Sequence, residues 1–222
     1  MARVHMLRHA TGMRMIRRLL RLVAALVPGL FAAGGAFAQA GAVDVTREGD
    51  FVIVTAGIDL AVDVKTAWAV LTDYEGYPRF VSDMHSSKIL SRGGPESDGP
   101  LVIEQKGEFG FLVFTQPVEV RMVVFESPPR TIVARAISGS FRDFIGRYEI
   151  TPTQAGVRLG YTGRFVPDFV MPPVIGLAAV RYSMQKRFDE LVAEIQRRDA
   201  EARRAPRDMR PAPPALPSPF AP

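Results

Sequence analysis

The sequence contains no cysteine among its 222 residues, and it has only one tryptophan and three histidines. The lack of cysteine excludes disulfide bonds, thiolate zinc sites, a cysteine nucleophile and a lipoprotein anchor. His85 is the only histidine after residue 38, and one histidine with scattered carboxylates has no metal-ligand spacing. No glycine-rich phosphate loop is present. We therefore expect no metal site and no cofactor.

The first 38 residues lack acidic side chains altogether, although they contain six arginines. An apolar run follows at 22–33, and the small residues Ala36 and Ala38 flank Phe37 just before Gln39. A basic region, an apolar region and a small-residue site in this order are typical of a secretory signal peptide. We expect cleavage after Ala38 and export, most simply to the periplasm. An uncleaved membrane anchor and twin-arginine export are the alternatives.

The positive charge of the chain is concentrated at its two ends. The whole sequence has a net charge of +5, but the chain from Gln39 has 22 basic and 23 acidic residues. The region between the signal segment and the tail is therefore not basic, and we expect no nucleic-acid partner because such proteins display a basic surface.

The last segment, 201–222, is rich in proline and arginine, with seven prolines from Pro206 onward. Proline blocks helix formation and removes hydrogen-bond donors, so we expect an extended, disordered tail. A spacer is the simplest interpretation. A ligand for a proline-binding partner and a basic surface anchor are the alternatives.

The intervening segment, 39–200, alternates strand-like and helical patterns. A β-branched strand is expected at 51–60, followed by two short helices at 64–72 and 75–80, with Asp63 as the N-cap of the first. Six more strands are expected at 85–91, 100–108, 112–126, 130–138, 144–152 and 156–166, because turn residues separate these runs.

A long helix is expected at 174–200. Its apolar residues recur every three or four positions, at Leu177, Val180, Met184, Phe188, Leu191 and Ile195. No other predicted helix is long enough to cover this stripe, so the sheet must do so. The sequence thus predicts an α+β protein: a curved, seven-stranded antiparallel sheet around its C-terminal helix. A cavity between sheet and helix is the default ligand site of this arrangement.

Two segments resemble a known family. Residues 72–81, TDYEGYPRFV, and 138–150, SGSFRDFIGRYEI, are similar to segments of the coenzyme-Q-binding START-like family, part of the SRPBCC or polyketide-cyclase-like superfamily. The resemblance covers roughly residues 52–196. It implies the helix-grip fold and the binding of an apolar ligand such as a quinone, a lipid or an aromatic polyketide.

Candidate catalytic residues are few. Asp83, His85 and Ser86 cannot converge as a triad, because alternate side chains of a strand point in opposite directions. Asp73 and Glu75 form a possible acid/base pair, but a helix-end role is simpler. We therefore expect no catalytic residue.

The aromatic and aliphatic residues that face the predicted cavity are the candidate ligand contacts. They are Tyr77, Phe80, Val81, Met84, Phe109, Phe111, Phe114, Tyr148, Tyr161, Phe165, Leu177, Met184 and Phe188. Arg121 and Arg135 lie in strands, either on the outer face or in reach of a ligand head group.

These observations favour an exported, non-enzymatic carrier of a hydrophobic small molecule, with transient membrane contact as a further possibility. A cyclase or aromatase that uses the same pocket is the first alternative. A protein-interaction module is the second.

Overall fold

The computed structural model describes residues 41–93, 99–111, 114–171 and 175–205. The chain separates into two units, Met1–Ala38 and Gln39–Pro222, and every described residue belongs to the second. The predicted signal segment, its cleavage site at Ala38 and Gln39, and the tail beyond residue 205 lie outside the described residues.

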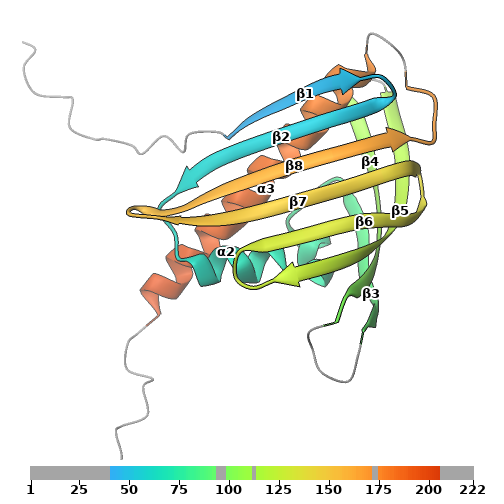
Figure 1. Ribbon diagram of the computed structural model, residues 1–222. Helices are drawn as coiled ribbons and strands as arrows, with labels where there is room; N and C mark the ends of the chain where they lie inside the picture. Colours follow the sequence, from blue (N-terminus) through green and yellow to red (C-terminus); the bar gives the residue numbers. More distant parts are fainter. Residues whose placement is uncertain (1–40, 94–98, 112–113, 172–174, 206–222) are drawn as a thin grey trace, which may run out of the picture. The chain divides into compact units, whose positions relative to one another are not determined.

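The described chain is built on one antiparallel sheet in the order β1-β2-β8-β7-β6-β5-β4-β3 (Figure 1). The strands are β1 (Ala42–Glu48), β2 (Phe51–Leu60), β3 (Met84–Arg92), β4 (Leu101–Phe111), β5 (Phe114–Ser127), β6 (Thr131–Gly139), β7 (Phe141–Thr153) and β8 (Gly156–Pro167). The prediction of an α+β helix-grip fold is confirmed, with one strand more than expected.

The additional strand is β1, which pairs with β2 across a turn at Gly49. The prediction of seven strands was wrong here because β1 is an edge strand that buries only two side chains, Val43 and Val45. The rest of the strand is polar and exposed, so its sequence carries almost no apolar alternation.

Two short helices connect β2 to β3, as the sequence predicts. α2 (Val64–Leu71) begins at Asp63, whose carboxylate accepts a hydrogen bond of 2.7 Å from the Lys65 amide, so the predicted N-cap is confirmed. η1 (Tyr74–Arg79) is a 3₁₀ helix with Pro78 inside it.

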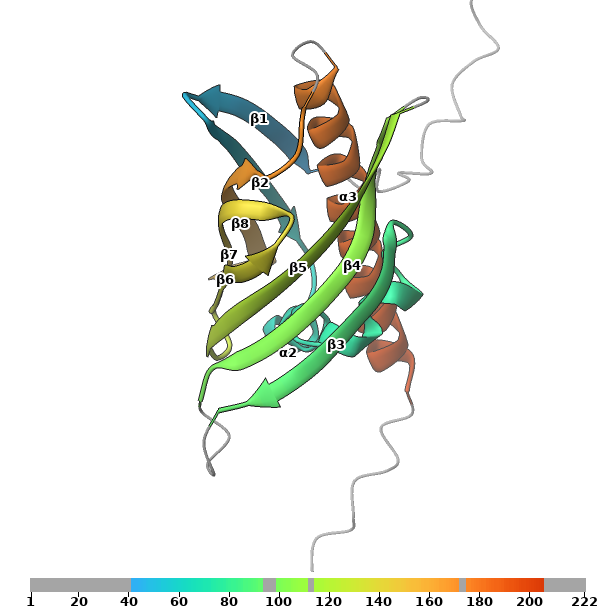
Figure 2. The same cartoon turned by 90° about the vertical axis from the view of Figure 1, so that its right-hand side faces the viewer.

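The long helix α3 (Gly176–Arg204) lies along the concave face of the sheet (Figure 2). It continues four residues beyond the predicted domain end at residue 200, so residues 201–204 are helical instead of tail. Charged pairs one turn apart extend it: Arg197 bonds Glu201 at 2.6 Å and Arg203 bonds Asp199 at 2.6 Å.

The apolar stripe of α3 packs into the core as predicted, with Phe188, Leu191 and Ile195 at most 3% exposed. They belong to one core cluster that also includes Val54 of β2, Leu159 of β8 and Leu71 of α2. Among the described residues, no helix has the length and apolar character needed to cross a membrane.

Candidate functional site

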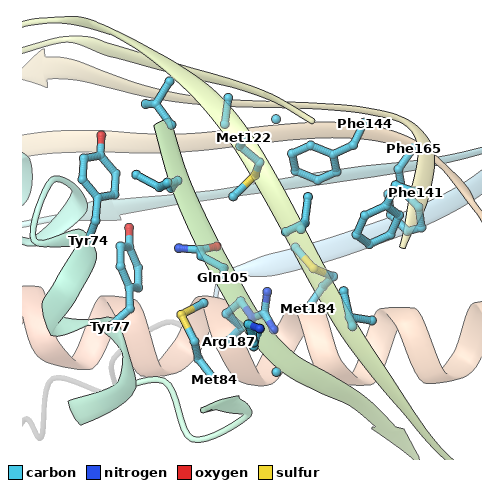
Figure 3. A pocket seen from close by; sticks show the side chains of 18 of the residues that line it. Tyr74, Tyr77, Met84, Gln105, Met122, Phe141, Phe144, Phe165, Met184 and Arg187 are labelled. Atoms are coloured by element: carbon cyan, nitrogen blue, oxygen red, sulfur yellow. The ribbon is translucent and has the colours of Figure 1, made fainter. Parts of the chain in front are cut away.

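A cavity of about 140 Å³ lies between the concave face of the sheet and α3 (Figure 3). The largest group of its lining residues is aliphatic or sulfur-containing: Leu71, Met84, Ile103, Val118, Val120, Met122, Val124, Ile132, Ala134 and Met184. Aromatic residues close its two ends, with Tyr74 and Tyr77 of η1 at one end and Phe141, Phe144 and Phe165 at the other.

A pair of glycines makes room for part of this wall. Gly146 of β7 and Gly163 of β8 are direct partners in the sheet. A Cβ on Gly163 would lie 2.5 Å from the hydroxyl oxygen of Tyr161, and one on Gly146 would lie 3.3 Å from it. The Tyr161 ring therefore packs over Gly163 and its hydroxyl reaches Gly146, which the Phe144 ring also covers, so a larger residue at either position would collide with these rings.

Phe141 is the centre of the aromatic cluster at the far end of the cavity. Its ring centroid lies 5.3 Å from that of Phe165, 5.6 Å from Phe144, and 6.4 Å from both Phe109 and Phe169. Most of these contacts are edge-to-face, the geometry that aromatic quadrupoles favour. The cluster forms a rigid apolar surface suited to a ring or a hydrocarbon chain.

The two tyrosines of η1 already have hydrogen-bond partners. The Tyr74 hydroxyl donates to Glu126 at 2.7 Å, and the Tyr77 hydroxyl donates to the Leu71 carbonyl at 2.9 Å. Burial raises the pKa of Tyr77 well above its ordinary value, and burial together with the Glu126 bond raises that of Tyr74. Both hydroxyls are therefore engaged in hydrogen bonds within the protein.

Tyr148 and Tyr161 differ from the η1 pair because neither hydroxyl bonds another described residue. The two residues are direct partners in the sheet, and their ring centroids lie 4.7 Å apart. Burial raises the pKa of Tyr148 to about 12 and also raises that of Tyr161. Both hydroxyls are thus neutral at pH 7 and available as hydrogen-bond donors to a bound molecule.

Arg187 of α3 supplies the unpaired positive charge in the cavity wall. Its Nε atom is buried without a hydrogen-bond partner, and none of the ion pairs between described side chains includes it. Its guanidinium carbon lies 5.8 Å from the ring centroid of Phe109. The charge of Arg187 partly offsets the raised pKa of Tyr148 and of Tyr161, and all three side chains line the same cavity.

The boundary between α3 and the start of β3 is held by polar contacts. Glu190 accepts bonds from the Ser82 amide at 3.0 Å and the Ser82 hydroxyl at 2.5 Å, and Lys186 donates to Asp83. A Cβ on Gly107 would lie 2.2 Å from the Asp83 carbonyl oxygen. Glycine at this position lets the segment close tightly against β4.

Comparison with known proteins identifies the family. The sequence pattern of the polyketide cyclase/dehydrase and lipid transport family matches residues 52–198. The chain belongs to this family. None of the curated proteins matches the chain.

Solved structures show the same fold as this family member. The Zhui aromatase/cyclase from Streptomyces sp. R1128 is 18% identical, with 67% of this chain and 95% of that chain covered at a TM-score of 0.56. A STAR-related lipid transfer protein from Xanthomonas axonopodis is 11% identical, with coverages of 71% and 99% and a TM-score of 0.52. A START superfamily protein from Mycobacterium smegmatis is 18% identical, with coverages of 68% and 98% and a TM-score of 0.51.

The cavity of this family member brings together seven of the candidate contacts from the sequence: Tyr77, Met84, Phe109, Tyr148, Tyr161, Phe165 and Met184. Val81 and Phe188 are instead buried in the core, while Phe80 and Leu177 pack against it. The side chains of Phe111 and Phe114 lie outside the described residues.

The sequence reasoning missed several residues of the cavity wall, above all Arg187, Phe141 and Phe144. The signal for Arg187 is visible in the sequence: it follows Met184 by three positions and precedes Leu191 by four. Residues three or four positions apart are neighbours on a helix surface, so this spacing places Arg187 beside the apolar stripe. Phe141 precedes the strand expected at 144–152 and Phe144 begins it, whereas in the structure both belong to β7.

The remaining candidates lie away from the cavity. The side chain of His85 is 62% exposed, and Asp73 is paired with Arg79 and Arg198. Arg121 bonds Glu104 on the outer face, and Arg135 is exposed. Within the described part of the chain, no three His, Asp or Glu side chains come together as metal ligands.

Proposed function

We propose that the chain is an exported carrier that holds a small apolar molecule in the cavity between the sheet and α3. The observation that carries this proposal is the cavity itself, whose wall is mainly apolar and has aromatic residues at both ends. Burial of each CH₂ group of a ligand there contributes about 0.8 kcal/mol. The family description, which names lipid transport as well as cyclase chemistry, supports the same function.

The volume of the cavity limits the size of the ligand. An engineered cavity of about 150 Å³ in another protein binds benzene, so a cavity of about 140 Å³ holds one ring or a short chain. A quinone with a long prenyl tail, or a complete phospholipid, requires further opening between the sheet and the helix. We therefore expect ring-sized ligands to bind more tightly than long ones.

Direct extraction and a cavity-filling variant test this proposal. The protein purified from the periplasm is extracted with organic solvent, and the extract is analysed by mass spectrometry for small apolar molecules. In parallel, binding of a series of alkylbenzenes is measured by calorimetry with the wild type and with Ala134→Leu, which places a larger side chain in the cavity.

We expect Ala134→Leu to weaken binding at least tenfold and to leave the thermal unfolding temperature unchanged or higher. Thr162→Leu is the matched control because it adds the same side chain to an exposed strand position. Equal binding by the two variants, or no binding by the wild type, would contradict the proposal.

Export has its own test. Expression of the full chain in a Gram-negative host, followed by N-terminal sequencing of the periplasmic protein, is expected to give Gln39 as the first residue. Replacement of Ala36 and Ala38 by leucine is expected to block cleavage, because signal peptidase sites require small side chains. Recovery of the uncut chain in the membrane fraction of the wild type would favour the anchor instead.

A cyclase or aromatase is the second candidate function. It is favoured by the unpaired donors of Arg187, Tyr148 and Tyr161, which line the same cavity and are suited to polarising a substrate carbonyl. If the protein is an enzyme of this kind, Tyr161→Phe is expected to abolish turnover of a reactive polyketone chain while ligand binding persists. A carrier shows no turnover in either form.

A further inference from the structure

Arg187 is unusual among the described arginines because it lines the cavity without an acidic partner. The described ion pairs of α3 include Arg181, Arg197, Arg198 and Arg203, but not Arg187. A buried donor without a partner costs about 1–3 kcal/mol, and more when the group is charged. The contact with the Phe109 ring at 5.8 Å offsets only part of this cost, so the missing hydrogen-bond partner is expected to come from a ligand.

The surroundings of Arg187 define the chemistry of that partner. The neutral hydroxyls of Tyr148 and Tyr161 have no bond to another described residue, and the Arg187 charge acts on both. A planar guanidinium is suited to two parallel hydrogen bonds with a carboxylate. The acidic residue of the cavity wall, Glu108, lies instead beside His85 at 4.0 Å, with a side chain that is 40% exposed.

We propose that the ligand is a small monocarboxylate whose acidic group binds Arg187 and whose apolar body occupies the aromatic end of the cavity. This inference rests on the proposed binding function and names its substrate class. One cation balances one negative charge, which favours a monoanion over a doubly charged phosphate. The phenylalanine cluster around Phe141 accommodates either an aromatic ring or a short aliphatic chain.

Matched acid and amide pairs test the charge without a change of shape. Binding of 4-ethylbenzoate and 4-ethylbenzamide is measured by calorimetry at pH 7, and octanoate and octanamide form the aliphatic pair. We expect each acid to bind the wild type at least about tenfold more tightly than its amide, as charge-assisted hydrogen bonds do. The pair whose acid binds more tightly shows whether the cavity prefers a ring or a chain as the apolar body.

Variants then assign the preference to Arg187. Arg187→Met is expected to reduce the ratio of acid to amide affinity to about one, and Arg187→Lys to restore part of it. Arg181→Met is the matched control: it removes the same charge from the same helix, where Arg181 is exposed and paired with Asp44. It is expected to keep the wild-type ratio.

The outcomes separate this inference from the function on which it rests. Amides that bind as tightly as acids overturn the carboxylate proposal and leave the carrier function standing. No binding of any of the four probes contradicts the carrier function for small ligands. A loss of the acid preference in Arg181→Met as well as in Arg187→Met shows an effect of overall charge and also overturns the proposal. The wild-type comparison remains decisive if Arg187→Met does not fold.

Discussion

Two arginines of α3, Arg187 and Arg198, lie three helical turns apart and have opposite environments. The guanidinium carbon of Arg198 is 5.6 Å from the Phe80 ring, and that of Arg187 is 5.8 Å from the Phe109 ring. Arg198 also bonds Glu194 at 2.6 Å and Asp73 at 2.7 Å. Arg187 has no acidic partner among the described residues. The protein thus satisfies one of these charges and leaves the other open toward the cavity.

The difference suggests separate roles for two charges on one helix: Arg198 stabilises the fold, and Arg187 is available to bind a ligand. Near Arg198, every acid and base takes part in a network that connects α3 to the start of η1. Around Arg187, the cavity wall is mainly apolar and includes the neutral phenols of Tyr148 and Tyr161. A charge that the fold does not use is a better candidate for ligand recognition than a charge in a closed network.

Glu194→Ala is expected to give the largest effect, a loss of about 3 kcal/mol in the free energy of unfolding. The Glu194 side chain is only 9% exposed and accepts bonds from both Arg197 and Arg198, so its removal leaves two arginines without their main partner. Urea denaturation measures the change. Glu201→Ala is the control, because Glu201 pairs with Arg197 on the exposed side and is worth under about 0.5 kcal/mol. Equal losses would show that burial of Glu194 is unimportant.

Arg198→Met is expected to cost about 2 kcal/mol, since it leaves Glu194 and Asp73 each with one partner fewer while keeping most of the apolar packing. The same urea denaturation measures this loss. Affinity for an alkylbenzene probe in the cavity is expected to stay within twofold of the wild type. A large loss of affinity would show that the network near η1 also shapes the cavity.

Arg187→Met is expected to have the opposite sign: the ligand-free protein becomes more stable by about 1 kcal/mol. The variant removes a buried donor that has no partner and adds an apolar side chain to an apolar wall. Thermal unfolding of the ligand-free protein measures the shift. Destabilisation as large as that of Arg198→Met would mean that Arg187 supports the fold, and the contrast between the two arginines would disappear.

The smallest expected effect is the pH dependence of stability, which is flat near neutral pH and steepens only in acid. Hydrogen bonds from Arg197 hold the pKa of Glu194 at about 2, below its ordinary 4.5. Because the folded pKa is lowered, this stabilisation is present above about pH 4.5 and is lost as the pH falls toward about 2. Acid titration of unfolding is expected to show a flatter curve for Glu194→Gln. Identical curves would contradict the role of Glu194.

The sequence predicts the elements better than it predicts the cavity wall. Strong periodicity located α3 and most strands, because a buried stripe leaves a clear pattern, whereas β1 was missed because it buries only Val43 and Val45. The cavity depends on tertiary placement: the room above Gly146 exists only because Gly163 is its partner across β7 and β8. Periodicity indicates which side chains point inward, but it does not indicate whether an inward side chain packs against a neighbour or lines a cavity.

The pairing of β2 with β8 sets the order in which the sheet is completed. Ile58 lies beside Leu159 and Val52 beside Phe165. This edge of β2 therefore has no partner until β8 has formed. During synthesis the β1–β2 hairpin emerges first, with one backbone edge and its apolar face uncovered until about a hundred more residues have followed. Such long-range closure is slow, and a chain that folds in this way benefits from a holding chaperone until its final strand and helix arrive.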